Sequence, residues 1–464
     1  MAPYDRKEAP HLTDSSDNIL GDPRKAVLRM SAPIALALLV QYLNSLADMF
    51  WVSGLGADAL AAVSIVTPIY MTIISVGNGI GTGASYAISK RIGAGDRESA
   101  SSAAVQSVVI TLIAGVASLA ILAVAVGPVM RYMGAGGIIG LCTDYAYPVI
   151  IFAPLLMMGG VLSGCLRGEG AAKRSTFILV VAAVFNIILD PVFIYWLDMG
   201  IAGAAYAMVV SAAISMIPAV YWYAVKKDVL TPISFKSFRF TRSEVRSISE
   251  VGVPQTVELV IMSLMSVFFV RSVSFTGGTD LVAVFEVTWR IAMIMMVPAQ
   301  AIGFALVPIL SASFGMKDPD RVKVSFVHGI KLSVAIMAVI AVLTALLAPY
   351  LTELMTLSDD SARLRPYMAD MLVVCTLFFP AFSLINASSA LMQSMGLGTA
   401  SLFLTIVRNL AIAAVYAWLS VFRIASYMWW GMTVCEIAFG VVTFVAAIVL
   451  FRRDSHIGRP ISQL

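Results

Sequence analysis

The chain has 464 residues and a net charge of +4, and 59% of its residues are hydrophobic while only 12% are charged. Because a soluble domain carries about 25% charged residues, this composition predicts a polytopic membrane protein and gives no indication of nucleic-acid binding. The first 25 residues are polar and contain no short apolar core, so we expect no signal peptide. The four cysteines and three histidines have no metal-ligand spacing, so we expect no cofactor and no metal beyond a transported ion.

Twelve apolar segments follow, each long enough, at about 20 residues, to cross a bilayer as a helix. The predicted spans are 30–52, 60–88, 103–128, 143–166, 175–197, 201–225, 251–276, 280–312, 328–350, 367–395, 400–422 and 428–451. The sequence therefore predicts an all-α fold of twelve transmembrane helices.

Lysine and arginine set the predicted orientation. If the N-terminus lies in the cytoplasm, the inner segments hold 23 of these residues and the outer loops hold 4. Basic residues accumulate on the cytoplasmic side of membrane proteins. We therefore expect a multi-pass protein of the cytoplasmic (inner) membrane with both termini in the cytoplasm.

The longest central polar segment, 226–250, follows the sixth span and divides the chain into 1–225 and 251–464. Short landmarks repeat between these two parts: IGAGDRESA at 92–100 and FGMKDPDRV at 314–322 share a glycine and an aspartate at an offset of 222. Both parts begin on the inner side and hold six spans, which predicts parallel repeats with the substrate path between them.

Two acidic residues lie inside predicted spans of the first half, Asp48 in QYLNSLADMFWVSGLG and Asp190 in NIILDPVFIY. A carboxylate in hydrocarbon costs several kcal/mol and usually marks a functional site. Counting about 1.5 Å per residue places both at a similar depth, some 22–26 Å above the inner ends of their helices. Asn186 lies one turn before Asp190, and Pro191 frees a carbonyl in that turn.

These groups form a predicted cluster of hard oxygen ligands that suits Na⁺ or a shared proton. No basic residue lies inside the first-half spans to neutralise the acids. The alternative is that each aspartate only bonds neighbouring hydroxyls or amides and joins helices.

The second half carries intramembrane residues of both signs. Glu286 and Arg290 are four residues apart in the order that favours an intrahelical pair, and Glu436 and Arg408 can pair between helices. One interpretation is that these are neutralised structural pairs. The rival is a second ion site around Glu258 or Glu286.

Candidate cavity residues lie near Asp48. Gln41 and Asn44 precede it by seven and four residues on the same helix face, and Tyr145 lies near the outer end of the fourth span. The alternative is that these side chains pack between helices. No GxxxxGK[ST] motif is present, so transport driven by the chain's own ATP hydrolysis is not expected. No nucleophile–base or metal constellation indicates an enzyme.

The chain resembles the multidrug and toxic compound extrusion (MATE) family, most closely its prokaryotic DinF-type branch. The resemblance covers nearly the whole chain. It rests on ILGDPRKAVLRMSAP (19–33), NSLADMFWVSGLGADALAAV (44–63), ISKRIGAGD (88–96), LRGEGAAKRS (166–175), NIILDPVFIY (186–195) and GAAYA (203–207).

The resemblance implies two six-helix lobes around a V-shaped cavity, and antiport of organic cations or amphipathic toxins against H⁺ or Na⁺. It assigns ion coupling to Asp48, Asn186 and Asp190. It also assigns a helix bend to Pro33 and cavity positions to Gln41 and Tyr145. We expect a monomer whose partners are drugs and membrane lipid.

Three residues depart from the family pattern. Ser163 replaces an asparagine before LRGEG, Met208 replaces a threonine after GAAYA, and Asn44 replaces an aromatic cavity residue. We keep Ser163 in the predicted coupling set, and Met208 and Asn44 in the predicted cavity. Fewer oxygen ligands favour H⁺ over Na⁺ as the coupling ion.

The sequence leaves two alternatives open. Another branch of the family places its ion site on second-half acids, and Glu258 lies about one turn from that position. The superfold also includes lipid-linked precursor flippases, whose central cavity tends to be cationic. The unpaired acids of the first half favour cationic drugs as substrates over such lipids.

Overall fold

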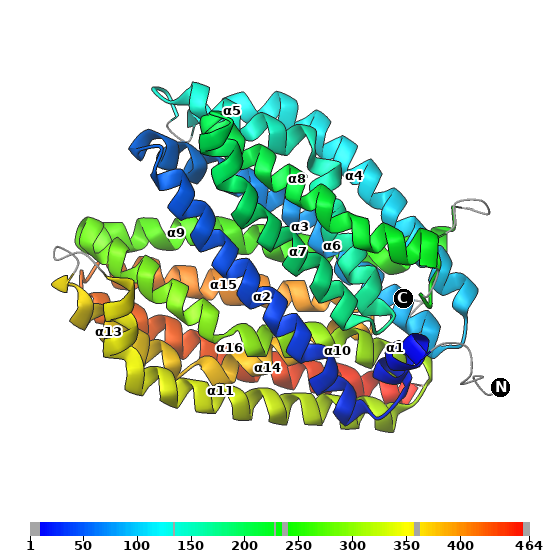
Figure 1. Ribbon diagram of the computed structural model, residues 1–464. Coiled ribbons are helices and arrows are strands. Elements are labelled where there is room, and N and C mark those ends of the chain that lie inside the picture. Colours follow the sequence, from blue (N-terminus) through cyan, green and yellow to red (C-terminus); the bar gives the residue numbers. More distant parts are fainter. Residues whose placement is uncertain (1–9, 133–134, 227–228, 234–239, 357–361, 458–464) are drawn as a thin grey trace.

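The computed structural model describes residues 10–132, 135–226, 229–233, 240–356 and 362–457, and its regular elements within these ranges are helices (Figure 1). The first half contains α1 (Pro10–Leu20), α2 (Pro23–Ser53), α3 (Ala57–Gly93), α4 (Arg97–Tyr132), α5 (Ile139–Ile151), α6 (Ala153–Gly168), α7 (Ala172–Pro191), η1 (Val192–Trp196), α8 (Gly200–Val220) and η2 (Tyr221–Lys226). The second half contains α9 (Arg242–Met295), α10 (Val297–Gly315), α11 (Pro319–Met355), α13 (Arg365–Thr376), α14 (Phe379–Ser394), α15 (Gly398–Ser420) and α16 (Ala425–Ile457).

Ten of the described helices are long and apolar enough to cross a membrane, and the number becomes twelve if each of two bent pairs forms one span. The predicted spans fall on these helices, so the predicted all-α membrane fold is confirmed. The seventh and eighth predicted spans meet inside α9, whose backbone is non-helical at Gly277 and Gly278. The eighth span then continues through α10.

Proline explains where the two bent pairs break. The pairs are α5 with α6, which are bent by 53°, and α13 with α14, which are bent by 48°. Pro154 and Pro380 lie in the first turn of α6 and α14. Because proline has no N–H to donate to the preceding turn, the earlier helix ends there. The two prolines occupy corresponding places in the two halves.

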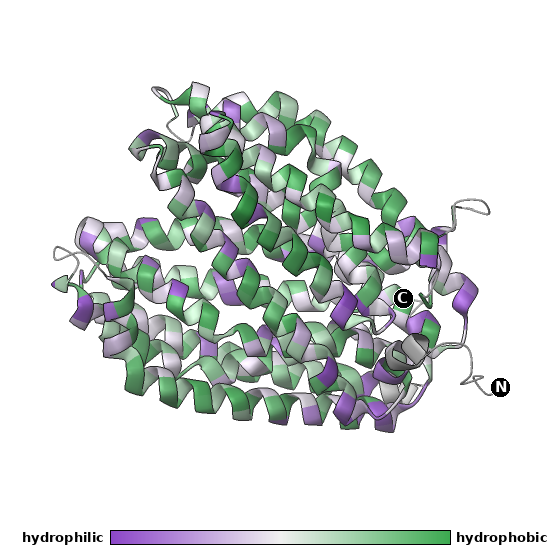
Figure 2. Ribbon diagram, in the orientation of Figure 1, coloured by the Kyte–Doolittle hydropathy of each residue, from purple (hydrophilic) through white to green (hydrophobic). Residues whose placement is uncertain are grey.

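Lipid-facing surface covers the length of the helices. Figure 2 shows hydrophobic residues along most of each helix and hydrophilic residues gathered toward the helix ends. Large apolar side chains are exposed in mid-helix, among them Val124 and Leu346. A bilayer solvates such side chains, and it requires the backbone to satisfy its own hydrogen bonds, which helices do.

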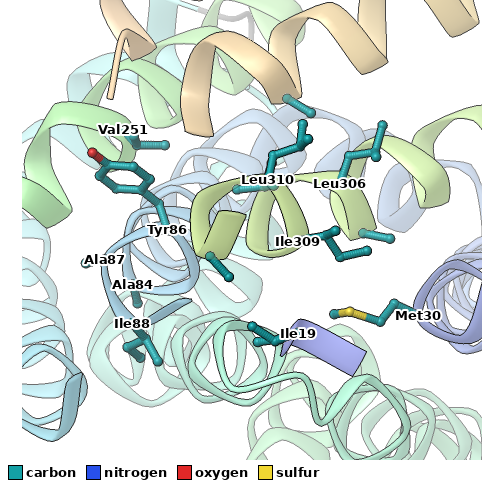
Figure 3. Close-up of a cluster of buried hydrophobic side chains, with 14 of the residues drawn as sticks. Ile19, Met30, Ala84, Tyr86, Ala87, Ile88, Val251, Leu306, Ile309 and Leu310 are labelled. Atoms are coloured by element: carbon teal, nitrogen blue, oxygen red, sulfur yellow. The ribbon is translucent and has the colours of Figure 1, made fainter. Parts of the chain in front are cut away.

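Buried hydrophobic residues show how the halves meet. One cluster lies within the first half and includes Tyr145, and another lies within the second half and includes Tyr416. A third cluster contains residues of both halves. Figure 3 shows part of it, with Tyr86 of α3 beside Val251 of α9.

This shared cluster lies toward the end of the molecule where α3, η2 and α16 finish, here called the basic end. In Figure 1 the helices α3 to α8 and the helices α9 to α16 diverge away from that end. The two halves are therefore joined most closely at the basic end.

The internal repeat has a structural counterpart at this junction. Gly93, at the end of α3, packs against Ala312 of α10, while Gly315, at the end of α10, packs against Lys90 of α3. A Cβ at either glycine would collide with the backbone of the other half, so glycine permits this close crossing.

The turns that follow are also alike. Asp96 accepts a hydrogen bond from the Ser99 amide at 3.0 Å, and Asp318 accepts one from the Arg321 amide at 2.9 Å. Each aspartate thus caps the start of a helix. The repeated glycine and aspartate have the same two roles in each half.

Polar contacts also tie the basic end together. Arg91 of α3 forms an ion pair with Glu244 of α9 at 2.8 Å. Arg321 of α11 donates to the Ile19 carbonyl of α1 at 2.7 Å. The predicted linker 226–250 lies partly outside the described residues, which exclude 227–228 and 234–239, and α9 begins within it.

A buried carboxyl group holds the described part of this linker. Glu169 follows α6 and accepts hydrogen bonds from the amide and the hydroxyl of Thr231, both at 3.1 Å. Both residues are buried. Burial raises the pKa of Glu169 to about 7 from its ordinary 4.5, although the bonds from Thr231 act in the opposite direction.

We expect Glu169→Gln to remove a pH dependence of stability. The folded state binds the Glu169 proton more tightly than the unfolded state, so this group's contribution is greatest below its unfolded pKa. That contribution is lost as pH rises toward the folded pKa of about 7, a change of about 3 kcal/mol. The neutral amide still accepts a bond from Thr231. The unfolding temperature in detergent is measured from about pH 5 to about pH 8. It should fall with rising pH for the parent protein and change less for the variant.

The control is Glu98→Gln, at an exposed position in the first turn of α4. It should keep the parent's decline. Equal slopes for the parent and Glu169→Gln would contradict the prediction.

Candidate functional site

The structure brings Asp48 and Asp190 together. Asp48 lies on α2 and Asp190 near the end of α7, and the two helices pack along each other. Asp190 directly precedes Pro191, after which the helix widens into the π-helical turn η1. The two carboxyl groups lie within hydrogen-bonding reach of each other.

Two asparagine amides connect these acids. Asn186 donates to Asp190 Oδ1 at 3.0 Å from one turn earlier on α7. Asn44 of α2 donates to Asp48 Oδ2 at 3.2 Å and to Asn186 Oδ1 at 3.0 Å. The result is a continuous chain of side chains from one acid to the other. Asp190 and Asn186 are 2% and 4% exposed, so the chain ends inside the protein.

No lysine or arginine of the described residues neutralises the cluster. Among the described residues, neither Asp48 nor Asp190 forms an ion pair with a lysine or arginine. Asn44 Oδ1 and Asp48 Oδ1 are buried and have no hydrogen-bond partner. Because buried acceptors without a donor are costly, a proton or a small cation bound at these oxygens would stabilise the arrangement.

Tyrosines from two further helices complete the surroundings. Tyr70 of α3 and Tyr145 of α5 both lie within electrostatic range of Asp48, and Tyr145 also lies near Asp190. Tyr145, a predicted cavity residue, is buried. Tyr70 could not be identified from the sequence, because a single span does not reveal which helix faces it.

Other predicted residues lie elsewhere. The Ser163 hydroxyl of α6 shares a 2.7 Å hydrogen bond with that of Ser175, at the opposite end of α7 from Asp190. The structure does not bring Ser163 to the acid cluster. Met208 of α8 packs at the edge of the first-half hydrophobic cluster.

The predicted features of α2 have mixed outcomes. Gln41 is exposed, as a cavity or surface position requires. Pro33, the position at which the resemblance allows the helix to bend, lies inside α2, which continues through it. Asn44, a predicted cavity residue, directs both of its hydrogen bonds to the acid cluster.

One second-half pair is confirmed. Arg408 of α15 lies 3.7 Å from Glu436 of α16, and both are buried. Glu258 of α9 accepts a hydrogen bond from Thr405 at 3.1 Å and is attracted by the charge of Arg408. Two acids therefore share one guanidinium, which makes Glu258 part of a structural charge cluster rather than an isolated acid.

The other predicted pair does not form. Glu286 is exposed and makes no ion pair with Arg290 in the described chain. Arg290 instead directs its guanidinium to the Met49 sulfur of α2 at 3.5 Å. Both residues line a pocket of about 180 Å³ between α2 and α9, together with Tyr42 and Trp289.

Comparisons with known proteins agree with this architecture. The MatE family model matches residues 33–192 and 254–419. A solved structure described as the outward-facing conformation of a multidrug resistance MATE family transporter is similar with a TM-score of 0.91 and 32% identity, covering 95% of this chain and 98% of that one.

Two curated relatives differ in what they are said to transport. The probable multidrug resistance protein YoeA of Bacillus subtilis is 26% identical over 376 residues, which are 78% of this chain and 80% of the relative. An FAD transporter of Shewanella oneidensis is 27% identical over 313 residues, which are 66% of this chain and 69% of the relative.

Proposed function

The chain belongs to the MatE family of membrane transporters, and from this premise we propose that it exports organic cations and other amphipathic toxins in exchange for protons. The observation that carries the proposal is the pair Asp48 and Asp190, which no described lysine or arginine neutralises and which is joined through Asn44 and Asn186. The similarity to a probable multidrug resistance protein supports the substrate class.

The acid pair supplies a mechanism for exchange. Two adjacent carboxyl groups in low dielectric do not both ionise easily. Protonation removes the negative charge that attracts a cationic drug, and a bound drug disfavours protonation. Such mutual exclusion is reciprocal by linkage, and it is what an antiporter requires.

The proposed transport path runs between the two halves of the chain. We assign the basic end to the cytoplasm because lysine and arginine gather there. Contacts between α3, α9 and α10 close that end, which supports an outward-facing state. Alternating access then requires these contacts to separate. Since one chain contains both halves of the path, the proposed working unit is a monomer in the inner membrane.

The oxygen ligands favour a proton over Na⁺. The Ser163 hydroxyl is engaged with Ser175, and Met208 offers a thioether in place of a hydroxyl. Na⁺ prefers several hard oxygen ligands, whereas a shared proton needs only the two carboxyl groups. Sodium coupling at Asp48, Asn186 and Asp190 is the competing outcome of the experiment below.

We expect a cationic drug to bind more weakly as pH falls. Purified protein in detergent is titrated with ethidium, a fluorescent organic cation, at constant ionic strength across a pH series. In proteoliposomes, a proton gradient imposed without Na⁺ should drive ethidium transport. If binding ignores pH but weakens with Na⁺ and not with K⁺, the site is a sodium site. If neither ion affects binding or transport, the antiport proposal is wrong.

Anionic substrates are the alternative class. Lipid-linked precursors carry phosphate groups, and one relative is described as an FAD transporter. Such ligands need a cationic site, whereas the acids Asp48 and Asp190 have no basic partner in the part of the chain that the structure describes. The anion class would be favoured if FAD, but not ethidium, bound to the purified protein.

A further inference from the structure

We propose that Asn44 is a positioning residue of the coupling site, which ties α2 to α7 and makes drug binding sensitive to the coupling cation. This inference rests on the proposed antiport. It assigns Asn44 to ion coupling rather than to contact with the drug, and it concerns the position at which this chain departs from the aromatic residue of the family pattern.

The contacts of Asn44 carry the argument. A side-chain amide has two N–H donors and one carbonyl acceptor. Asn44 Nδ2 donates to Asp48 Oδ2 on its own helix and to Asn186 Oδ1 on α7. Both donors are thereby engaged at the acid cluster, so none remains for a drug.

The direction of these bonds matters. Asn186 passes its own donor to Asp190 Oδ1, so each acid receives an amide N–H from one member of the chain. Replacing Asn44 by an apolar residue would leave Asp48 without its amide donor and Asn186 without its bond to α2. The separation of α2 from α7 would then no longer be coupled to the state of the acids.

The unsatisfied oxygens indicate what completes the site. Asn44 Oδ1 and Asp48 Oδ1 are both buried without a hydrogen-bond partner. The side-chain nitrogens that Asn44 and Asn186 direct at the acids already donate to Asp48 Oδ2 and Asp190 Oδ1. A proton or a small cation is the chemical species that two neighbouring buried acceptors require, and its binding would strengthen the link between the helices.

The remaining charged or titratable neighbours come from several helices. Asp190 faces the site from α7, Tyr70 from α3 and Tyr145 from α5. From the second half, Arg290 contacts Met49 of α2 and Glu286 lines the pocket beside Tyr42. None of these groups forms the bridge between Asp48 and Asn186 that Asn44 provides.

The test compares Asn44→Leu, which keeps the size but removes the amide, with Asn386→Leu. Among the described residues, Asn386 of α14 donates to the Phe382 carbonyl of its own helix alone, so it matches in residue type without touching the site. Ethidium affinity is measured by fluorescence titration across pH and, separately, across Na⁺ concentration with K⁺ as the control salt. Unfolding temperature is measured for each protein.

The ratio of ethidium affinities between the two ends of the pH or Na⁺ series measures the cation dependence. We expect this ratio to be about tenfold smaller in Asn44→Leu than in the parent, and unchanged in Asn386→Leu. A merely structural role would lower the unfolding temperature without altering that dependence. If Asn44→Leu does not fold, Asn44→Ser is measured in its place. A serine hydroxyl has one donor and cannot donate to both Asp48 and Asn186.

Unaltered cation dependence in the folded Asn44 variant, with a cation-dependent parent, would overturn this inference alone. A parent protein whose ethidium binding depends on neither cation would instead overturn the proposed antiport. The two failures are thus distinguishable.

Discussion

Asp48→Asn is expected to abolish gradient-driven drug export while the protein still folds. The amide keeps the size of the carboxyl group but carries no charge and cannot be protonated in the working pH range. The amide oxygen of the new side chain can still accept the hydrogen bond from Asn44, so α2 should still pack on α7. Export should fall to the level of cells without the transporter. The measurement is ethidium efflux from cells that express each protein at matched levels.

The matched control is Asp58→Asn. Asp58 is exposed in the first turn of α3 and lies outside the acid cluster, so its loss should leave export intact. Size-exclusion chromatography in detergent reports whether each variant is folded. Normal efflux by folded Asp48→Asn would show that coupling does not pass through this carboxyl group.

Much of the membrane fold could be predicted from the sequence. Hydrocarbon forces each spanning segment to satisfy its own backbone hydrogen bonds, so apolar length identifies helices. Depth along the helix also placed Asp48 and Asp190 at one level, and the structure brings them within reach. Periodicity and length are local properties, and local properties can be read from one sequence.

The contacts between helices could not be predicted in the same way. Spacing allows Glu286 and Arg290 to pair, yet Arg290 turns across the pocket that α2 and α9 line and contacts Met49 of α2. Spacing along α2 does not reveal whether Asn44 faces a cavity or α7. Only the position of Asn186 shows that Asn44 contacts α7. The partner of Ser163 is likewise set by the neighbouring helix, because Ser175 of α7 lies opposite it and bonds its hydroxyl.

Arg408→Leu is expected to destabilise the protein by about 3–5 kcal/mol, the range for removing one partner of a buried ion pair. Arg408 and Glu436 are 5% and 8% exposed, and Glu258 also depends on the same guanidinium. Without Arg408, two acids remain buried with no positive charge beside them. Thermal unfolding in detergent measures the loss, and Arg131→Leu, at the exposed end of α4, serves as the control.

A second substitution identifies the cause. Adding Glu436→Leu to Arg408→Leu removes one stranded acid and replaces the pair by apolar side chains, which is often neutral or stabilising for buried ion pairs. The double variant should therefore recover part of the lost stability. If it is less stable than Arg408→Leu alone, then Arg408 contributes through packing rather than through charge.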